Sequence, residues 1–237
     1  MEFLSYLFNE VLYRPLFNSL IFLYNQIPGH DFGLAIIILT ILIKLILFPV
    51  SQKAIKSQKE TQAIQPKIKE IQEKYKNDRE KQGRAMMELY KEHKVNPAAG
   101  CLPLIIQFLV LIAMFTVFRT GLDPEKLKSL YWFIERPETI NHFFLGIVDL
   151  AKGSIIFGVL AGITQFIQSK MMMTNKPASG KNDFAGLMNK QMLYVFPVMT
   201  VFLGIKFPAG LALYWTLSNI LTIIQQYFFL KKNGKQS

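Results

Sequence analysis

The residue best placed for chemistry is Lys44, which lies inside an apolar run from Gly33 to Val50. As a helix with about 1.5 Å of rise per residue, this run is about 27 Å long, close to the thickness of a bilayer's hydrocarbon core. A charge at that depth costs about 2.5–3.5 kcal/mol on insertion scales, so such a residue usually faces the protein interior and is functional. The alternative is that Lys44 extends its stem toward the lipid headgroups.

Other apolar runs also carry polar side chains, and Thr40 precedes Lys44 by one helical turn on the same helix face. An amide left bare in lipid costs several kcal/mol, so these groups pair with one another or line a hydrated cavity. Interhelical hydrogen bonds explain most of them. They do not explain Lys44, because no Asp or Glu lies within the expected membrane spans. The polar residues are Gln107, Thr116, Thr164, Gln165, Gln168, Tyr214, Trp215, Thr216, Ser218, Asn219, Thr222, Gln225 and Gln226.

The sequence contains no set of residues typical of catalysis. The three histidines, His30, His93 and His142, lack the spacing of metal ligands, and there is no phosphate-binding loop or nucleophile elbow. Cys101 is the only cysteine, which excludes an internal disulfide and suits a small apolar helix residue. We therefore expect a protein that is not an enzyme, with no catalytic residue, cofactor or metal.

The elements that must position Lys44 follow from the composition, because 51% of the 237 residues are hydrophobic and 18% are charged. These proportions are typical of an integral membrane protein. The sequence predicts an all-α protein with five transmembrane helices, at residues 33–50, 98–119, 153–173, 191–206 and 209–230.

The segments between the expected spans differ strongly in charge. Residues 51–97 hold 12 Lys and Arg, and the loop 174–190 and the tail 231–237 are also basic. By the positive-inside rule these segments are cytoplasmic, which puts the N-terminus outside and the C-terminus inside. Apolar residues at helical spacing predict a helical hairpin in 51–97 and an amphipathic interfacial helix in 1–28, while 120–152 is expected to be an outer loop.

Several short stretches, in order along the chain, resemble the YidC/Oxa/Alb family of membrane protein insertases. They include Ile43-Lys-Leu-Ile-Leu-Phe-Pro49, Gln65-Pro-Lys-Ile68, Met86-Met-Glu-Leu-Tyr-Lys91, Val95-Asn-Pro-Ala-Ala-Gly-Cys-Leu-Pro103 with Gln107, and Phe207-Pro-Ala-Gly-Leu-Ala-Leu-Tyr-Trp-Thr-Leu-Ser-Asn219 followed by Gln225-Gln226. The resemblance covers about residues 30–230. It indicates the short bacterial YidC form, without the large periplasmic domain of many relatives.

The resemblance implies five helices around a hydrophilic groove that opens toward the cytoplasm. It assigns groove and substrate contacts to Lys44, Thr40, Gln165 and Trp215, and Tyr214, Ser218 and Asn219 fall in the same expected groove. The basic groove residue of the family is usually arginine. Lys44 retains the charge but lacks the planar, bidentate guanidinium.

The predicted function is therefore that of an insertase and folding chaperone for small membrane proteins, acting alone or with the Sec translocon. Lys44 would attract an acidic substrate tail into the groove, and the hydrophobic segment would leave between the third and fifth spans. The expected partners are nascent membrane proteins, the lipid bilayer, the Sec translocon, and the ribosome through the hairpin and basic tail. The expected location is the bacterial cell (inner) membrane. A small-solute transporter or channel and a ribosome-docking membrane tether are the alternatives.

Overall fold

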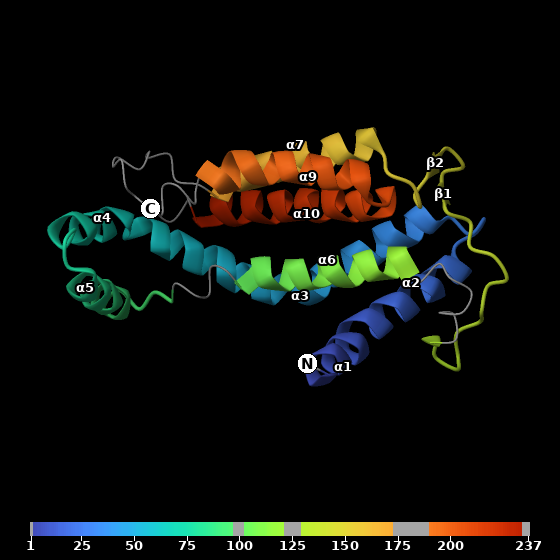
Figure 1. The fold of residues 1–237 in the computed structure, drawn as a ribbon, viewed down its shortest axis with the longest axis horizontal. Helices are drawn as coiled ribbons and strands as arrows, with labels where there is room; N and C mark the ends of the chain where they lie inside the picture. Colours follow the sequence, from blue (N-terminus) through green and yellow to red (C-terminus); the bar gives the residue numbers. More distant parts are fainter. Residues whose placement is uncertain (1, 97–101, 121–128, 173–189, 234–237) are drawn as a thin grey trace. The chain divides into compact units, whose positions relative to one another are not determined.

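The computed structural model describes residues 2–96, 102–120, 129–172 and 190–233, and these are mostly helical (Figure 1). Cys101, nearly all of the expected loop 174–190 and the end of the expected tail lie outside the described residues. The elements in chain order are α1 (Glu2–Phe8), the π-helix η1 (Asn9–Tyr13), α2 (Arg14–Gln26), α3 (Phe32–Ala63), α4 (Gln65–Lys74), α5 (Arg79–Glu92), α6 (Leu102–Thr120), β1 (Phe143–Phe144), β2 (Val148–Asp149), α7 (Ile155–Met172), the π-helix η4 (Gln191–Val195), α9 (Phe196–Lys206) and α10 (Ala209–Asn233).

Helix α3 continues well beyond the apolar run that contains Lys44. It passes through Pro49 and ends at Ala63, so the helix is longer than the expected span 33–50. Proline removes one backbone hydrogen bond, yet the residues that follow are mainly Gln, Lys and Ala, which favour helix. The chain divides into two units, one of residues 47–107 and one of residues 1–46 with 108–237.

In the larger unit, helices α7, α9 and α10 lie side by side (Figure 1). Gly158 and Gly162, one turn apart on α7, allow α9 to approach its backbone. A Cβ on Gly204 of α9 would lie 2.6 Å from the Gly158 Cα, closer than side-chain carbons come to backbone. This pattern of small residues four apart is typical of helix pairs in membranes.

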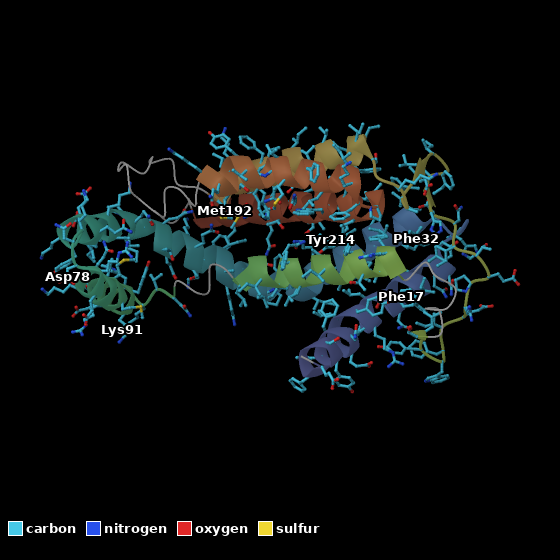
Figure 2. All side chains as sticks on the ribbon, in the orientation of Figure 1. Phe17, Phe32, Asp78, Lys91, Met192 and Tyr214 are labelled. Atoms are coloured by element: carbon cyan, nitrogen blue, oxygen red, sulfur yellow. The ribbon has the colours of Figure 1, made fainter. Side chains whose placement is uncertain are left out.

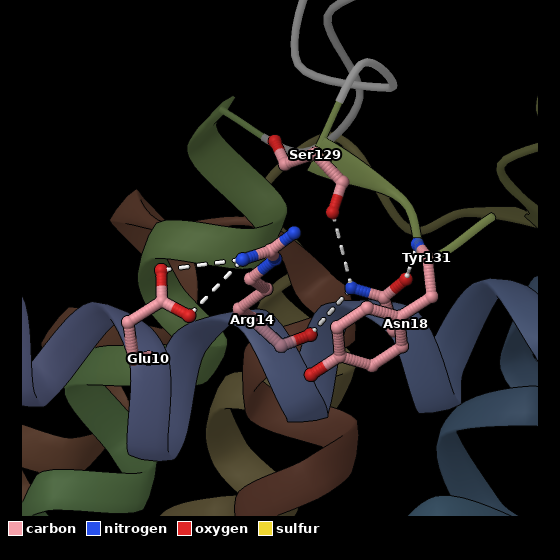
Figure 3. A network of polar contacts seen from close by, with 5 residues as sticks. All are labelled: Glu10, Arg14, Asn18, Ser129 and Tyr131. Atoms are coloured by element: carbon pink, nitrogen blue, oxygen red, sulfur yellow. Dashed lines mark hydrogen bonds and ion pairs between the residues drawn. The ribbon is translucent and has the colours of Figure 1, made fainter.

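Helix α2 is joined to residues 129–145 by side chains on successive turns. Asn18 accepts a hydrogen bond from the Tyr131 N–H at 2.6 Å and donates to the carbonyl oxygens of Ser129 and Arg14 (Figure 3). The Arg14 guanidinium lies over the Tyr131 ring and pairs with Glu10. Because the Asn18 side chain is buried, each of these bonds satisfies a group that has little access to water.

The same segment continues into the two-stranded antiparallel sheet of β1 and β2. Asp31, just before α3, accepts the backbone N–H groups of Leu34 and Leu145. Near the sheet, burial lowers the pKa of His142, and the nearby Asp149 carboxylate opposes this shift. A hydrogen bond from Lys152 lowers the pKa of Asp149 itself.

Helices α4 and α5 form a hairpin in the smaller unit. Its apolar cluster contains Ile64, Ile68, Leu89 and Val95, and its charged side chains cover both helices, with Asp78 at the turn (Figure 2). Asp78 caps α5 by accepting the Lys81 N–H at 3.0 Å, and this hydrogen bond lowers the pKa of the Asp78 carboxyl. The apolar spacing within residues 51–97 predicts such a hairpin.

By length and composition, two of the described helices are apolar enough to cross a membrane, Phe32–Ala63 and Ile155–Met172. Two shorter apolar helices cover Ile105–Arg119 and Gln191–Lys206. Helix α10 is long enough, but the Trp, Thr, Asn and Gln side chains along it lower its hydropathy. The five-span arrangement therefore remains a prediction.

Candidate functional site

Four polar residues lie on one face of α10. Trp215, Asn219, Thr222 and Gln226 follow one another at intervals of four, three and four residues, which places them in a single stripe along the helix. We call these residues the α10 polar stripe. The indole Nε1 of Trp215 donates to the Gln165 Oε1 on α7 at 3.0 Å, and Asn219 Nδ2 donates to the Thr164 Oγ1 at 3.3 Å.

Gln165 extends this network along α7. Its Nε2 donates to the Ser169 Oγ at 3.3 Å, and both side chains are buried. Trp215 and Gln165, which the family resemblance assigned to the groove from positions 50 residues apart, are thus in direct contact. Because a buried polar group without a partner is costly, these bonds hold α7 and α10 in one relative position.

Lys44 contacts the same stripe from α3. Its Nζ donates to the Thr222 Oγ1 at 2.9 Å, and the Thr222 hydroxyl donates to the Ser218 carbonyl oxygen at 2.8 Å. The ammonium is therefore directed into the bundle, toward α10. This geometry favours an inward-facing charge over extension toward the headgroups.

The other predicted site residues lie at different places in the bundle. The Thr40 hydroxyl is fully buried and donates within α3 to the Ile36 carbonyl oxygen at 2.6 Å. Tyr214 and Ser218 are buried on α10. The acceptor oxygens of Gln168 and Gln226 are buried with no hydrogen-bond partner among the described residues. Acceptors of this kind suit a donor that enters from outside, such as water or a peptide N–H.

An apolar cavity of about 260 Å³ adjoins the polar stripe. Trp215 belongs to both, because its ring lines the cavity while its N–H is bonded to Gln165. The exposed side chains of Phe108 and Ile112 on α6 also line the cavity. The remaining lining residues are Leu111, Phe115, Ala161, Thr200, Leu203, Gly204, Phe207, Leu211 and Ala212.

The position of the cavity differs from the exit route expected between the third and fifth spans. The corresponding helices, α7 and α10, are packed together and joined by the Trp215–Gln165 and Asn219–Thr164 hydrogen bonds. A segment that left between them would have to break both bonds. The apolar space lies instead among α6, α9 and α10, with Ala161 the α7 residue that lines it.

Two sets of structurally important residues were missing from the predicted site. Thr222 was recognised as polar but not as the partner of Lys44, although its place in the α10 polar stripe follows from its spacing from Trp215 and Asn219. The packing role of Gly158, Gly162 and Gly204 was also missed. The four-residue spacing of Gly158 and Gly162 was the available signal.

The side chains gathered here can bind a polypeptide. Among the described residues, no group of three or more His, Cys, Asp or Glu side chains is arranged to hold a metal ion. The site offers one ammonium, several amide and hydroxyl groups, and an apolar cavity. Such a surface can accept polar and apolar parts of one polypeptide together.

Comparison with known proteins agrees with this description. The profile of the family described as "60Kd inner membrane protein" matches residues 22–236. A protein of Fusobacterium nucleatum subsp. nucleatum named "Membrane protein insertase YidC" is 39% identical over 225 residues, a match that covers 94% of this chain and 98% of the relative. The chain belongs to the YidC family of membrane protein insertases. This confirms the resemblance seen in the sequence, and the family is not one of enzymes.

Other relatives of the YidC family are much longer than this chain. The YidC proteins of Geotalea daltonii and Syntrophus aciditrophicus are 41% and 43% identical to it, and the chain spans 38% and 36% of their lengths. The solved structure "Active YidC insertase crystal structure with the first transmembrane domain resolved" matches with a TM-score of 0.58 and 26% identity. The match covers 91% of this chain and 46% of that one, so the fold is shared over most of this chain.

Proposed function

We propose that this chain inserts small membrane proteins by accepting their polar segments along the α10 polar stripe, with Lys44 as the charge that attracts acidic tails. The observation that carries the proposal is the bond between Lys44 on α3 and Thr222 on the stripe, which directs an ammonium into the bundle. The acceptor oxygens of Gln168 and Gln226 are buried without a hydrogen-bond partner in the described part of the chain. They support a hydrated groove, because a buried acceptor that reaches no water is costly. The groove residues are Lys44, Thr40, Gln165, Trp215, Tyr214, Ser218 and Asn219.

The hydrophobic segment of the substrate would move into lipid past α6 and α9. The apolar cavity on that side, with Phe108 and Ile112 exposed at its edge, supports this route. Leu, Ile, Phe and Val each contribute about −0.3 to −0.6 kcal/mol at the bilayer centre, so ten such residues contribute about −3 to −6 kcal/mol. The lipid then supplies the driving force, and the groove lowers the barrier for the polar tail.

The proposed topology has five spans, an outer N-terminus and a cytoplasmic C-terminus in the bacterial inner membrane. The strongly basic segment 51–97 supports a cytoplasmic hairpin. In this arrangement α1 and α2 lie at the outer interface, and exposed Phe3, Tyr6 and Val11 suit contact with lipid. The hairpin and tail would contact the ribosome, and the Sec translocon would act with the chain on larger substrates.

Insertion by the purified protein in proteoliposomes tests this function. The substrate is a single-span protein with an acidic outer tail, compared with a version whose tail is neutral, and insertion is scored by protease protection. Lys44→Met should lower insertion of the acidic-tailed substrate about tenfold, because a charged hydrogen-bonding group is lost. Lys44→Arg should keep most of the activity.

Lys53→Met is the matched control, because Lys53 is an exposed lysine of the same helix. It should insert both substrates at the wild-type rate. Equal insertion of the acidic-tailed substrate by Lys44→Met and wild type would rule out the electrostatic role of Lys44. Insertion at the rate of protein-free liposomes would rule out insertion by this chain alone.

A further inference from the structure

Thr222 on α10 accepts a hydrogen bond from the Lys44 ammonium at 2.9 Å. We propose that Thr222 is a positioning residue, whose hydroxyl keeps the Lys44 ammonium at the α10 polar stripe as a neutral partner that a substrate carboxylate replaces. This inference rests on the proposed function, since it assigns the residue that places the attracting charge. It adds to the groove a specificity-determining position that lies outside the predicted site residues.

The hydrogen bonds of Thr222 set the direction in which it can act. A hydroxyl group has one hydrogen to donate and two lone pairs that accept. The Thr222 hydrogen is directed to the Ser218 carbonyl oxygen at 2.8 Å, which leaves lone pairs for Lys44 Nζ at 2.9 Å. Thr222 is therefore an acceptor toward the ammonium, held in place by its own helix.

A lysine needs such a partner more than an arginine does. Its ammonium is a compact charge on a flexible four-carbon stem, whereas a guanidinium is a planar fork with its donors already arranged. A flexible stem can also extend toward the headgroups, as the sequence alone allowed for Lys44. The bond to Thr222, from a helix 178 residues away in the sequence, favours the inward conformation.

The Thr222 hydroxyl is a neutral acceptor for the Lys44 ammonium. The expected spans contain no Asp or Glu, so no carboxylate is supplied to Lys44 from within them. Hydrogen bonds in which both partners are ionised are stronger than those to a neutral hydroxyl. A carboxylate on an entering substrate tail would therefore displace Thr222, and the ammonium would return to Thr222 when the tail leaves.

The test compares Thr222→Val, which keeps the shape but loses the hydroxyl, with Thr222→Ser, which keeps the hydroxyl. In proteoliposomes, Thr222→Val should slow insertion of the acidic-tailed substrate about fivefold, because a bond to a charged group is lost. Thr222→Ser should restore the rate, and the neutral-tailed substrate should be unaffected. Thr216→Val is the matched control, because that hydroxyl on the same helix donates only to its own Ala212 carbonyl at 2.8 Å.

A second readout does not depend on insertion. The rate at which an amine-reactive reagent modifies Lys44, followed by peptide mass spectrometry, should change severalfold in Thr222→Val, while the rate at Lys152 stays constant. An unchanged Lys44 rate, equal slowing of both substrates, or a Thr222→Ser variant as slow as Thr222→Val would overturn the inference. If Lys44→Met inserts normally while Thr222→Val still alters Lys44 labelling, the electrostatic proposal fails and the positioning role stands.

Discussion

Helices α7, α9 and α10 and the α4–α5 hairpin are both helical assemblies, yet they are stabilised differently. The three helices pack over Gly158 and Gly204 and share buried hydrogen bonds such as Trp215–Gln165. The hairpin shares a small apolar cluster, and its ion pairs, such as Arg84–Glu80, are exposed to solvent. Exposed ion pairs contribute little to stability, about 0–1 kcal/mol each.

The packed helices α7, α9 and α10 are the part of the molecule that must keep its geometry. Hydrogen-bond donors and acceptors can bind a substrate only if the helices that carry them keep fixed positions relative to one another. Close contact between the helix backbones fixes these positions. The hairpin positions no comparable set of buried polar groups among its described residues. It can open locally without disturbing the α10 polar stripe, because local stability follows local burial.

The largest effect on stability is expected from Gly204→Ala, which places a methyl group in the close contact between α7 and α9. The added Cβ would meet the Gly158 Cα at 2.6 Å, so the two helices must move apart. We expect a loss of about 3 kcal/mol in the free energy of unfolding, at the upper end of the usual cost of overpacking, because the atom that the Cβ meets belongs to the backbone. Unfolding of the protein in detergent mixtures measures it, and an unchanged stability would show that the contact is less close than described.

A smaller and local effect is expected from Ile68→Ala in the hairpin. Ile68 is buried in the cluster with Leu89, so the truncation removes apolar contacts and leaves a cavity. The expected cost is about 2 kcal/mol, at the low end for core truncations because the cluster is small. Hydrogen exchange should quicken in α4 and α5 while α7, α9 and α10 keep their protection. Faster exchange in both regions would show that they unfold together.

The smallest effect, with the opposite sign, is expected from Gly83→Ala in α5. Nothing lies within 4 Å of a Cβ at this position, and Gly83 is inside a helix. Alanine restricts the unfolded chain and favours helix, so the hairpin should gain about 0.5–1 kcal/mol. Slower hydrogen exchange in α5 would confirm it. A loss of stability would mean that the two regions do not differ in how they use glycine.

The polar residues of the last helix, the isolated Lys44 and the family motifs predict a groove that includes Trp215 and Gln165. That groove stays a prediction, and the structure adds that these two side chains are hydrogen-bonded to each other. The end of α3 could not be predicted from the apolar run, because helix formers after Pro49 continue the helix beyond it. The close packing of α7 and α9 was also missed, since the sequence does not show which helix packs against a glycine.

The residues alone define the chemistry of the expected spans: a lysine at mid-span, several amides and hydroxyls, and no carboxylate. They also indicate the family, through motifs that lie in order along the chain. The hydrogen-bond partners of these side chains depend on how the helices pack, because helical spacing defines a face but not what that face contacts. The Lys44–Thr222 bond joins residues 178 positions apart, and the glycines that let α7 and α9 approach matter only once those helices are packed.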